Sequence, residues 1–160
     1  MNSTSDSTAP IAAPITRGRR LLYLAVAVLS LVGLAETTYL TATHLAGAHV
    51  VCVTAANCSQ VLGSVYASFH GLPLAGVGAA GYFAVFSFAT LACFGYRLAS
   101  TLLALTVATM FLTTLWLLYL QAFVLHAFCD YCLFSAALIF LLAGLLIAAP
   151  SPRLEKTSDA

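Results

Sequence analysis

Five cysteines are the residues of this 160-residue chain best suited to chemistry, and four of them form two close pairs. Cys129 and Cys132 form a C-x-x-C motif, whereas Cys52 and Cys58 are separated by five residues. Closely spaced thiols can exchange electrons, form stabilising disulfides or hold a metal ion. Cys93 stands apart from both pairs, and we expect it to be a lone buried thiol.

The C-x-x-C motif lies where a short junction leads into an apolar run, so both sulfurs are expected near the first turn of a helix. The helix dipole and free amide groups there favour the thiolate form, and Asp130 opposes them with its negative charge. Two redox-active pairs are the favoured interpretation. Two structural disulfides stay open as an alternative. A four-cysteine zinc site is disfavoured because zinc ligands are usually more closely spaced, and we expect no metal.

The composition of the chain predicts a membrane protein. It is 62% hydrophobic and 7% charged, with a mean hydropathy of +1.01, whereas soluble domains carry about 25% charged residues. Four apolar runs, at about 21–43, 73–94, 101–125 and 131–149, each approach the ~20 helical residues that cross a bilayer. We therefore predict an all-α bundle of four transmembrane helices over 21–149, between tails at 1–20 and 150–160 that we expect to be disordered. The first run is expected to be a retained anchor rather than a cleaved signal peptide.

Basic residues predict the orientation of this bundle, because Lys and Arg are retained on the cytoplasmic side. With both termini cytoplasmic, all six Lys and Arg residues lie inside, and the 44–72 loop and the 125–132 junction lie outside with the four paired cysteines. The loop is expected to contain a short amphipathic helix between Val61 and Phe69, after which Pro73 opens the second span. The net charge of +1 gives no basic surface, so no nucleic-acid partner is expected.

Two dithiols in series need an electron donor and an electron acceptor. A protein thiol could reach Cys52 in the outer loop, while Cys132 is expected to point into the bundle. A quinone is the natural two-electron acceptor in a bilayer, and we infer it from location and electron count.

On these residues the chain resembles the vitamin K epoxide reductase family, specifically its bacterial members, over about residues 30–140. The resemblance rests on an ordered set of motifs: Gly33-Leu34, Tyr39-Leu40-Thr41, His44, Cys52-x5-Cys58, Ser64, Gly71-Leu72-Pro73-Leu74, Gly78, Tyr82 and Cys129-Asp130-Tyr131-Cys132.

The resemblance implies a quinone-dependent thiol oxidoreductase of the bacterial inner membrane that supports disulfide formation. Cys52 would exchange with a thioredoxin-fold partner, and Cys58 would pass electrons to Cys129. Cys132 would face the quinone and form the active thiolate or adduct. The quinone would be a ubiquinone, menaquinone or phylloquinone, with Ser64 hydrogen-bonded near its ring. The chain ends soon after the fourth span, so we expect the partner to be a separate, DsbA-like protein.

Two departures concern the quinone contacts of vertebrate members. Ala136 stands where those members have an aromatic residue, and Leu74 stands near the position of their second-span asparagine. Both positions are kept as candidate quinone contacts. The departures argue against a vitamin K epoxide or quinone reductase of the vertebrate type, which is an alternative together with a non-enzymatic membrane protein held by structural disulfides.

The sequence leaves open the roles of several other polar and aromatic residues. Glu36 lies in the first span, where a charge is costly, so either a functional role or an interior hydrogen bond would explain it. His126, three residues before Cys129, is expected to be an interfacial histidine rather than a proton shuttle. Trp116 and Tyr119 in the third span are expected to pack internally or to line a pocket.

Overall fold

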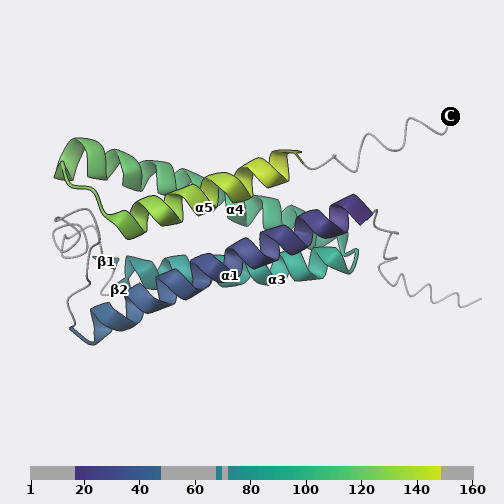
Figure 1. The fold of residues 1–160 in the computed structure, drawn as a ribbon, viewed down its shortest axis with the longest axis horizontal. Coiled ribbons are helices and arrows are strands. Elements are labelled where there is room, and N and C mark those ends of the chain that lie inside the picture. The colour runs from purple at the N-terminus through teal and green to yellow at the C-terminus, as the bar shows by residue number, and fades with distance from the viewer. Residues whose placement is uncertain (1–16, 48–67, 70–71, 149–160) are drawn as a thin grey trace, which may run out of the picture.

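The computed structural model describes residues 17–47, 68–69 and 72–148, and four long helices account for most of them (Figure 1). These helices are α1 (Arg17–Leu45), α3 (Leu74–Cys93), α4 (Arg97–Tyr119) and α5 (Asp130–Ala148). A π-helical segment, η2 (Leu120–Leu125), continues α4. All four helices are long and apolar enough to cross a membrane, α4 together with η2, which confirms the predicted all-α architecture of four spans.

The spans begin and end close to the predicted residues, except that α1 and α4 each start four residues earlier than predicted. These extra residues include Arg17, Arg19, Arg20 and Arg97. The helical backbone satisfies its own hydrogen bonds, so it continues beyond the apolar run, while the long basic side chains can extend toward water.

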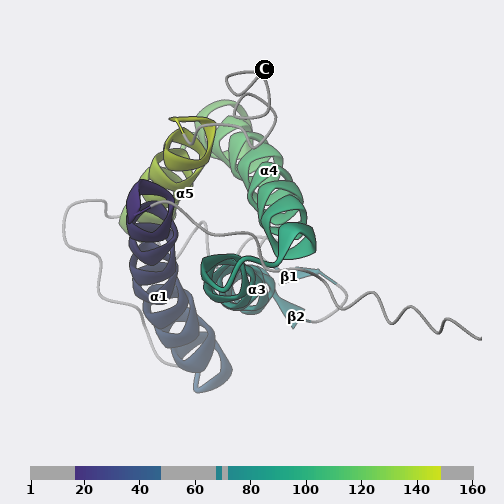
Figure 2. The same cartoon turned by 90° about the vertical axis from the view of Figure 1, so that its right-hand side faces the viewer.

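The four helices form a ring in which α1 contacts α3 and α5, and α4 contacts the same two helices (Figure 2). The start of α1, the α3–α4 turn and the end of α5 lie at one end of this bundle (Figure 1). We call it the arginine end, because it carries Arg17, Arg19, Arg20 and Arg97. The end of α1, the start of α3 and the junction before α5 lie at the opposite end, which we call the cysteine end because it carries Cys129 and Cys132.

Two short strands, β1 (Ser68–Phe69) and β2 (Leu72–Pro73), pair antiparallel at the cysteine end, with Ser68 opposite Pro73 and Phe69 opposite Leu72. The predicted amphipathic helix is therefore wrong at its last two residues, because strand pairing holds their backbone extended. The rest of that helix lies outside the described residues. Pro73 also does not open the second span, since it belongs to β2 and α3 begins at Leu74.

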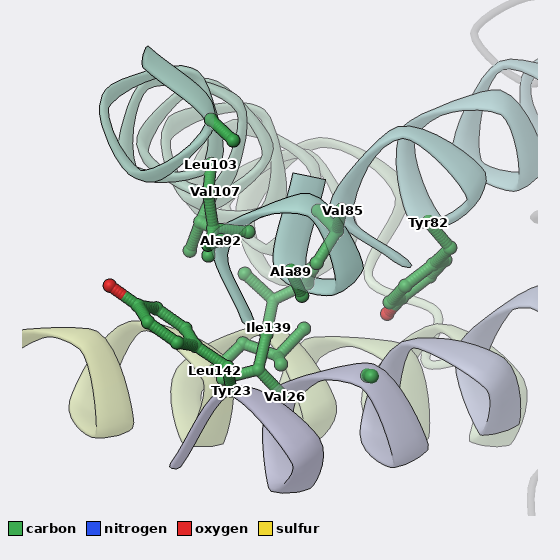
Figure 3. Close-up of a cluster of buried hydrophobic side chains, with 12 residues drawn as sticks. Tyr23, Val26, Tyr82, Val85, Ala89, Ala92, Leu103, Val107, Ile139 and Leu142 are labelled. Carbon is green, nitrogen blue, oxygen red and sulfur yellow. The ribbon is translucent and has the colours of Figure 1, made fainter. Parts of the chain in front are cut away.

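A buried apolar cluster closes the half of the bundle nearer the arginine end (Figure 3). Tyr23 and Val26 come from the first turns of α1, Leu103 from the early part of α4, and Leu142 from the later part of α5. Val85 of α3 is fully buried between these helices. Close packing of this kind excludes water and fixes the spacing of the helices, so any internal cavity has to lie toward the cysteine end.

Three residues lie in surroundings other than those predicted. Trp116 and Tyr119 are exposed on α4, with ring centroids 5.9 Å apart, because their side of the helix points away from the bundle. They do not pack inside the bundle, and they are not among the residues that line the cavity described below. Cys93 is the last residue of α3 and is only partly buried, because the helix ends at the surface of the arginine end.

Candidate functional site

A cavity of about 620 Å³ lies between the helices toward the cysteine end. All four helices contribute to its wall, and most of the wall is apolar. Polar residues are a minority of the lining and include Thr37 of α1, Thr109 of α4, Gln121 of η2 and Ser135 of α5. A large apolar cavity with a few polar groups is typical of a binding site for a small organic molecule.

Cys132 lies on the wall of this cavity, in the first turn of α5. Cys129 precedes the first residue of α5 and is fully buried beside Ala127, with Cys132 and Tyr131 packed against that pair. The carbonyl group of Cys129 accepts a 3.0 Å hydrogen bond from the amide of Leu133, which makes Cys129 the capping residue of the helix. Both cysteines are free thiols in this structure.

The two thiols are chemically unequal. A hydrogen bond from the Cys132 side chain lowers the pKa of Cys129, and the backbone amides of Cys132 and Tyr131 act in the same direction. Burial and the negative charge of Asp130 oppose this lowering without reversing it. The start of α5 therefore favours the thiolate of Cys129, while the Cys132 side chain faces the cavity.

Gln121 connects the cavity wall to Cys129, and sequence reasoning missed it. Its side-chain oxygen accepts a 3.2 Å hydrogen bond from the backbone amide of Cys129, and both residues are buried. Its backbone carbonyl accepts further bonds from the amides of His126 and Ala127. Gln121 is the only glutamine in the third span, eight residues before Cys129. An amide side chain in an apolar span was the signal that could have identified it.

His126 ends the third span with a left-handed backbone conformation, at φ 48°. This conformation is uncommon for residues other than glycine. It reverses the chain so that Ala127 and Cys129 fold back over Gln121. The side chain of His126 is exposed, which agrees with an interfacial histidine.

Tyr82 joins three helices beside the cavity. Its hydroxyl group is 2.9 Å from the Ser135 hydroxyl and donates to the Ser135 carbonyl at 3.2 Å, which links α3 to α5. Its ring lies against Gly33 of α1, where a Cβ atom would overlap the ring atoms. Glycine at position 33 therefore allows α1 and α3 to approach closely.

Glu36 is one turn beyond Gly33 on α1, and both of its carboxyl oxygens are buried without a hydrogen-bond partner among the described residues. The expected interior hydrogen bond is therefore not found in this part of the chain. Its charge interacts with Cys129, Cys132 and Tyr82. Glu36 thus belongs to the surroundings of the C-x-x-C motif.

The other candidate site residues fall into two groups. Leu74 and Ala136 both line the cavity, as does His44, and the proposed role of the first two as quinone contacts stays a prediction. Cys52, Cys58 and Ser64 lie outside the described residues, so their roles also stay predictions.

Comparison with known proteins gives one family. A model of the vitamin K epoxide reductase family matches residues 24–147, which is most of the chain. This range contains α3 and α4 entirely, α1 apart from its first seven residues, and α5 apart from its last residue. A search of curated proteins gives no match.

Proposed function

The chain belongs to the vitamin K epoxide reductase family, and we propose that it is a quinone-linked thiol oxidoreductase that supports disulfide formation. Family membership and four apolar helices make it a membrane oxidoreductase. The proposal adds the electron route: from a reduced thioredoxin-fold protein to Cys52 and Cys58, then to Cys129 and Cys132, and finally to a membrane quinone. The single observation that carries it is the position of Cys132 on the wall of a large apolar cavity.

The residues of the cavity fit a quinone. The volume of about 620 Å³ is within the usual range for small-molecule sites. Apolar walls suit the ring and the isoprenoid chain, while Gln121 and Thr109 offer hydrogen-bonding groups on the wall. When bound, a quinone supplies a two-electron acceptor that also takes up two protons. Leu74 and Ala136 would contact it through their apolar side chains.

The inequality of the two inner thiols suits disulfide exchange. We propose that Cys58 attacks the sulfur of Cys129 in a Cys129–Cys132 disulfide, which releases Cys132. Cys52 then attacks Cys58, which releases Cys129 and leaves the outer pair oxidised. The lowered pKa of Cys129 makes it a good leaving group in this second step. The inner pair, now a dithiol, is reoxidised when two electrons and two protons pass to the quinone.

The orientation proposed for the membrane places the cysteine end outside the cytoplasm. Arg17, Arg19, Arg20 and Arg97 lie together at the opposite end, which the positive-inside tendency assigns to the cytoplasm. A bacterial inner membrane gives this arrangement an oxidising outer side, where disulfides persist.

The test uses purified protein in lipid nanodiscs with a reduced thioredoxin-fold protein of the DsbA type as substrate. We expect thiol oxidation only when quinone is supplied, and none with Cys132→Ala. Cys93→Ala is the matched control, because it removes a thiol at the arginine end, and it should keep wild-type turnover. Full turnover of Cys132→Ala would contradict the proposed route.

Mixed-disulfide trapping distinguishes this function from structural disulfides. With Cys58→Ala, Cys52 can attack the disulfide of an oxidised partner, which forms a mixed disulfide and releases one partner thiol. Cys58 is then missing and cannot resolve this adduct, so the adduct should accumulate and be visible on a non-reducing gel. If both pairs instead stay locked as disulfides and no adduct forms, the cysteines are structural and the proposed function is wrong.

A further inference from the structure

Glu36 is a carboxyl group inside the bundle with no described partner for either of its oxygens. The nearest arginine along α1 is Arg20, sixteen residues earlier, which corresponds to about 24 Å of helix. A charged carboxylate at such a position lowers the stability of the bundle. Acidic side chains inside a span are therefore rare, and those that occur usually have a function. Glu36 therefore needs an explanation other than packing.

The groups around Glu36 indicate what that function is. On α1 it lies between Gly33, against which the Tyr82 ring packs, and Tyr39, whose ring centroid is 6.3 Å from that of Tyr131. Tyr131 stands between the two inner cysteines in the sequence. The titratable groups near Glu36 on the other elements are thus Tyr82 of α3 and the thiols of Cys129 and Cys132. The Tyr82 hydroxyl donates to the backbone of α5, so its proton is already engaged. The thiols are thus the groups near Glu36 that must lose protons in a redox reaction.

Dithiol oxidation requires a proton acceptor at this place. When Cys129 and Cys132 form a disulfide, two S–H bonds are lost, one S–S bond forms, and two electrons and two protons leave. The thiolate-favouring surroundings of Cys129 leave the Cys132 proton as the one that has to be removed during the reaction. The cavity wall is mainly apolar, and a buried carboxylate is the kind of base that such a step uses.

We propose that Glu36 exchanges protons with the inner cysteine pair, taking up the Cys132 proton as the disulfide forms and returning a proton when the disulfide is reduced. This inference rests on the proposed function, in which a quinone takes the two electrons. Glu36 keeps the Cys132 proton while the inner pair is a disulfide and returns it to Cys132 when the outer thiols reduce that disulfide, so the carboxyl group is unchanged after a complete cycle. The two protons that the quinone takes up come from water, and the outer dithiol replaces them when it is oxidised.

The kinetic test follows oxidation of the reduced inner pair by a soluble quinone in nanodiscs as a function of pH. Glu36→Gln keeps the size of the side chain and removes the base, so the rate should fall roughly 10²-fold, and the limb of the pH profile due to Glu36 should disappear. Glu36→Asp should restore that limb. Ser30→Ala removes another buried polar group of α1, bonded only to the backbone of its own helix, and should keep the wild-type profile.

A spectroscopic test does not depend on catalytic turnover. The chain has two glutamates, Glu36 and Glu155, so a Glu155→Gln protein with ¹³C-labelled glutamate carries the label at position 36 alone. Infrared difference spectra between the reduced protein and the protein oxidised with diamide should show an isotope-shifted carboxyl band. An unchanged carboxyl signal would overturn the proposal, as would a Glu36→Gln protein with the wild-type rate and pH profile.

Failure of the proposed function would look different. In that case the wild-type inner pair would not be oxidised by quinone at all. The infrared experiment uses a chemical oxidant, so it would still report whether Glu36 exchanges a proton with the pair.

Discussion

The hydrogen bond from the Cys129 amide to the side chain of Gln121 leads to a quantitative prediction. Gln121→Leu keeps a side chain of similar size but removes the acceptor, so the buried amide of Cys129 loses its partner. An orphaned buried amide costs about 1–3 kcal/mol. The observed bond is long, at 3.2 Å, at the outer limit of good geometry, so we expect the lower part of that range, about 1–2 kcal/mol.

This cost should appear mainly as local opening of the junction before α5. The backbone carbonyl of Gln121 keeps its bonds to the amides of His126 and Ala127 in the variant, so the end of the third span should stay in place. At about 1.4 kcal/mol per tenfold change, a cost of 1–2 kcal/mol makes the open state about 5- to 30-fold more populated. Cys129 is fully buried in the closed state, so its labelling should accelerate by the same factor.

The assay is alkylation of the reduced protein by a maleimide, with the labelled cysteine identified by mass spectrometry. It is run at a pH well above the ordinary thiol pKa, so that differences in ionisation do not affect the comparison. Thr106→Val is the matched control, because it removes another polar group from the cavity wall, one that bonds only to its own helix. Cys129 labelling in Gln121→Leu at the wild-type rate would refute the idea that this bond holds the junction closed.

Three further predictions concern the same half of the bundle. Cys132→Ala removes the hydrogen bond that lowers the pKa of Cys129. The pH profile of Cys129 alkylation should therefore move to higher pH, and the alkylation rate at neutral pH should fall. An unmoved profile would assign the lowered pKa to the backbone amides. Gly33→Ala places a methyl group in the ring of Tyr82 and should destabilise the protein by about 1–3 kcal/mol in denaturant titration, whereas Gly144→Ala, with open space around it, should not. Tyr82→Phe removes the hydroxyl that bonds α5, which should cost about 1 kcal/mol by the same titration; no loss of stability would mean that ring packing alone joins these helices.

The spans could be predicted from the sequence because one strong physical effect determines them. A run such as 131–149 has to form internal backbone hydrogen bonds wherever it meets hydrocarbon, and only a helix of that length does so within one segment. The pairing of Ser68 with Pro73 could not be predicted in this way, since local periodicity says nothing about which backbone segment faces a loop. The same apolar pattern therefore suggested a helix reaching Phe69.

The thiols of the candidate site could be predicted from the sequence, but the hydrogen bond and the backbone conformations that position them could not. A C-x-x-C motif before an apolar run indicates a helix start, which is where α5 begins. The bond between Gln121 and Cys129 depends on a π-helical segment and on the left-handed conformation of His126. Neither feature has a reliable sequence signal, because a histidine in a sequence does not by itself predict a left-handed backbone conformation.

The two halves of the bundle explain how a small membrane protein can hold a reactive site. Toward the arginine end, Val26, Val85, Leu103 and Leu142 are buried, and their packing fixes the helix positions without polar groups. Toward the cysteine end the same helices surround a cavity, and hydrogen bonds replace apolar contacts. Because the packed half sets the helix spacing, the other half can leave space for a substrate and still keep Cys132 at its wall. We therefore expect larger side chains in the packed half to disturb the cavity as strongly as substitutions of the cavity-lining residues themselves.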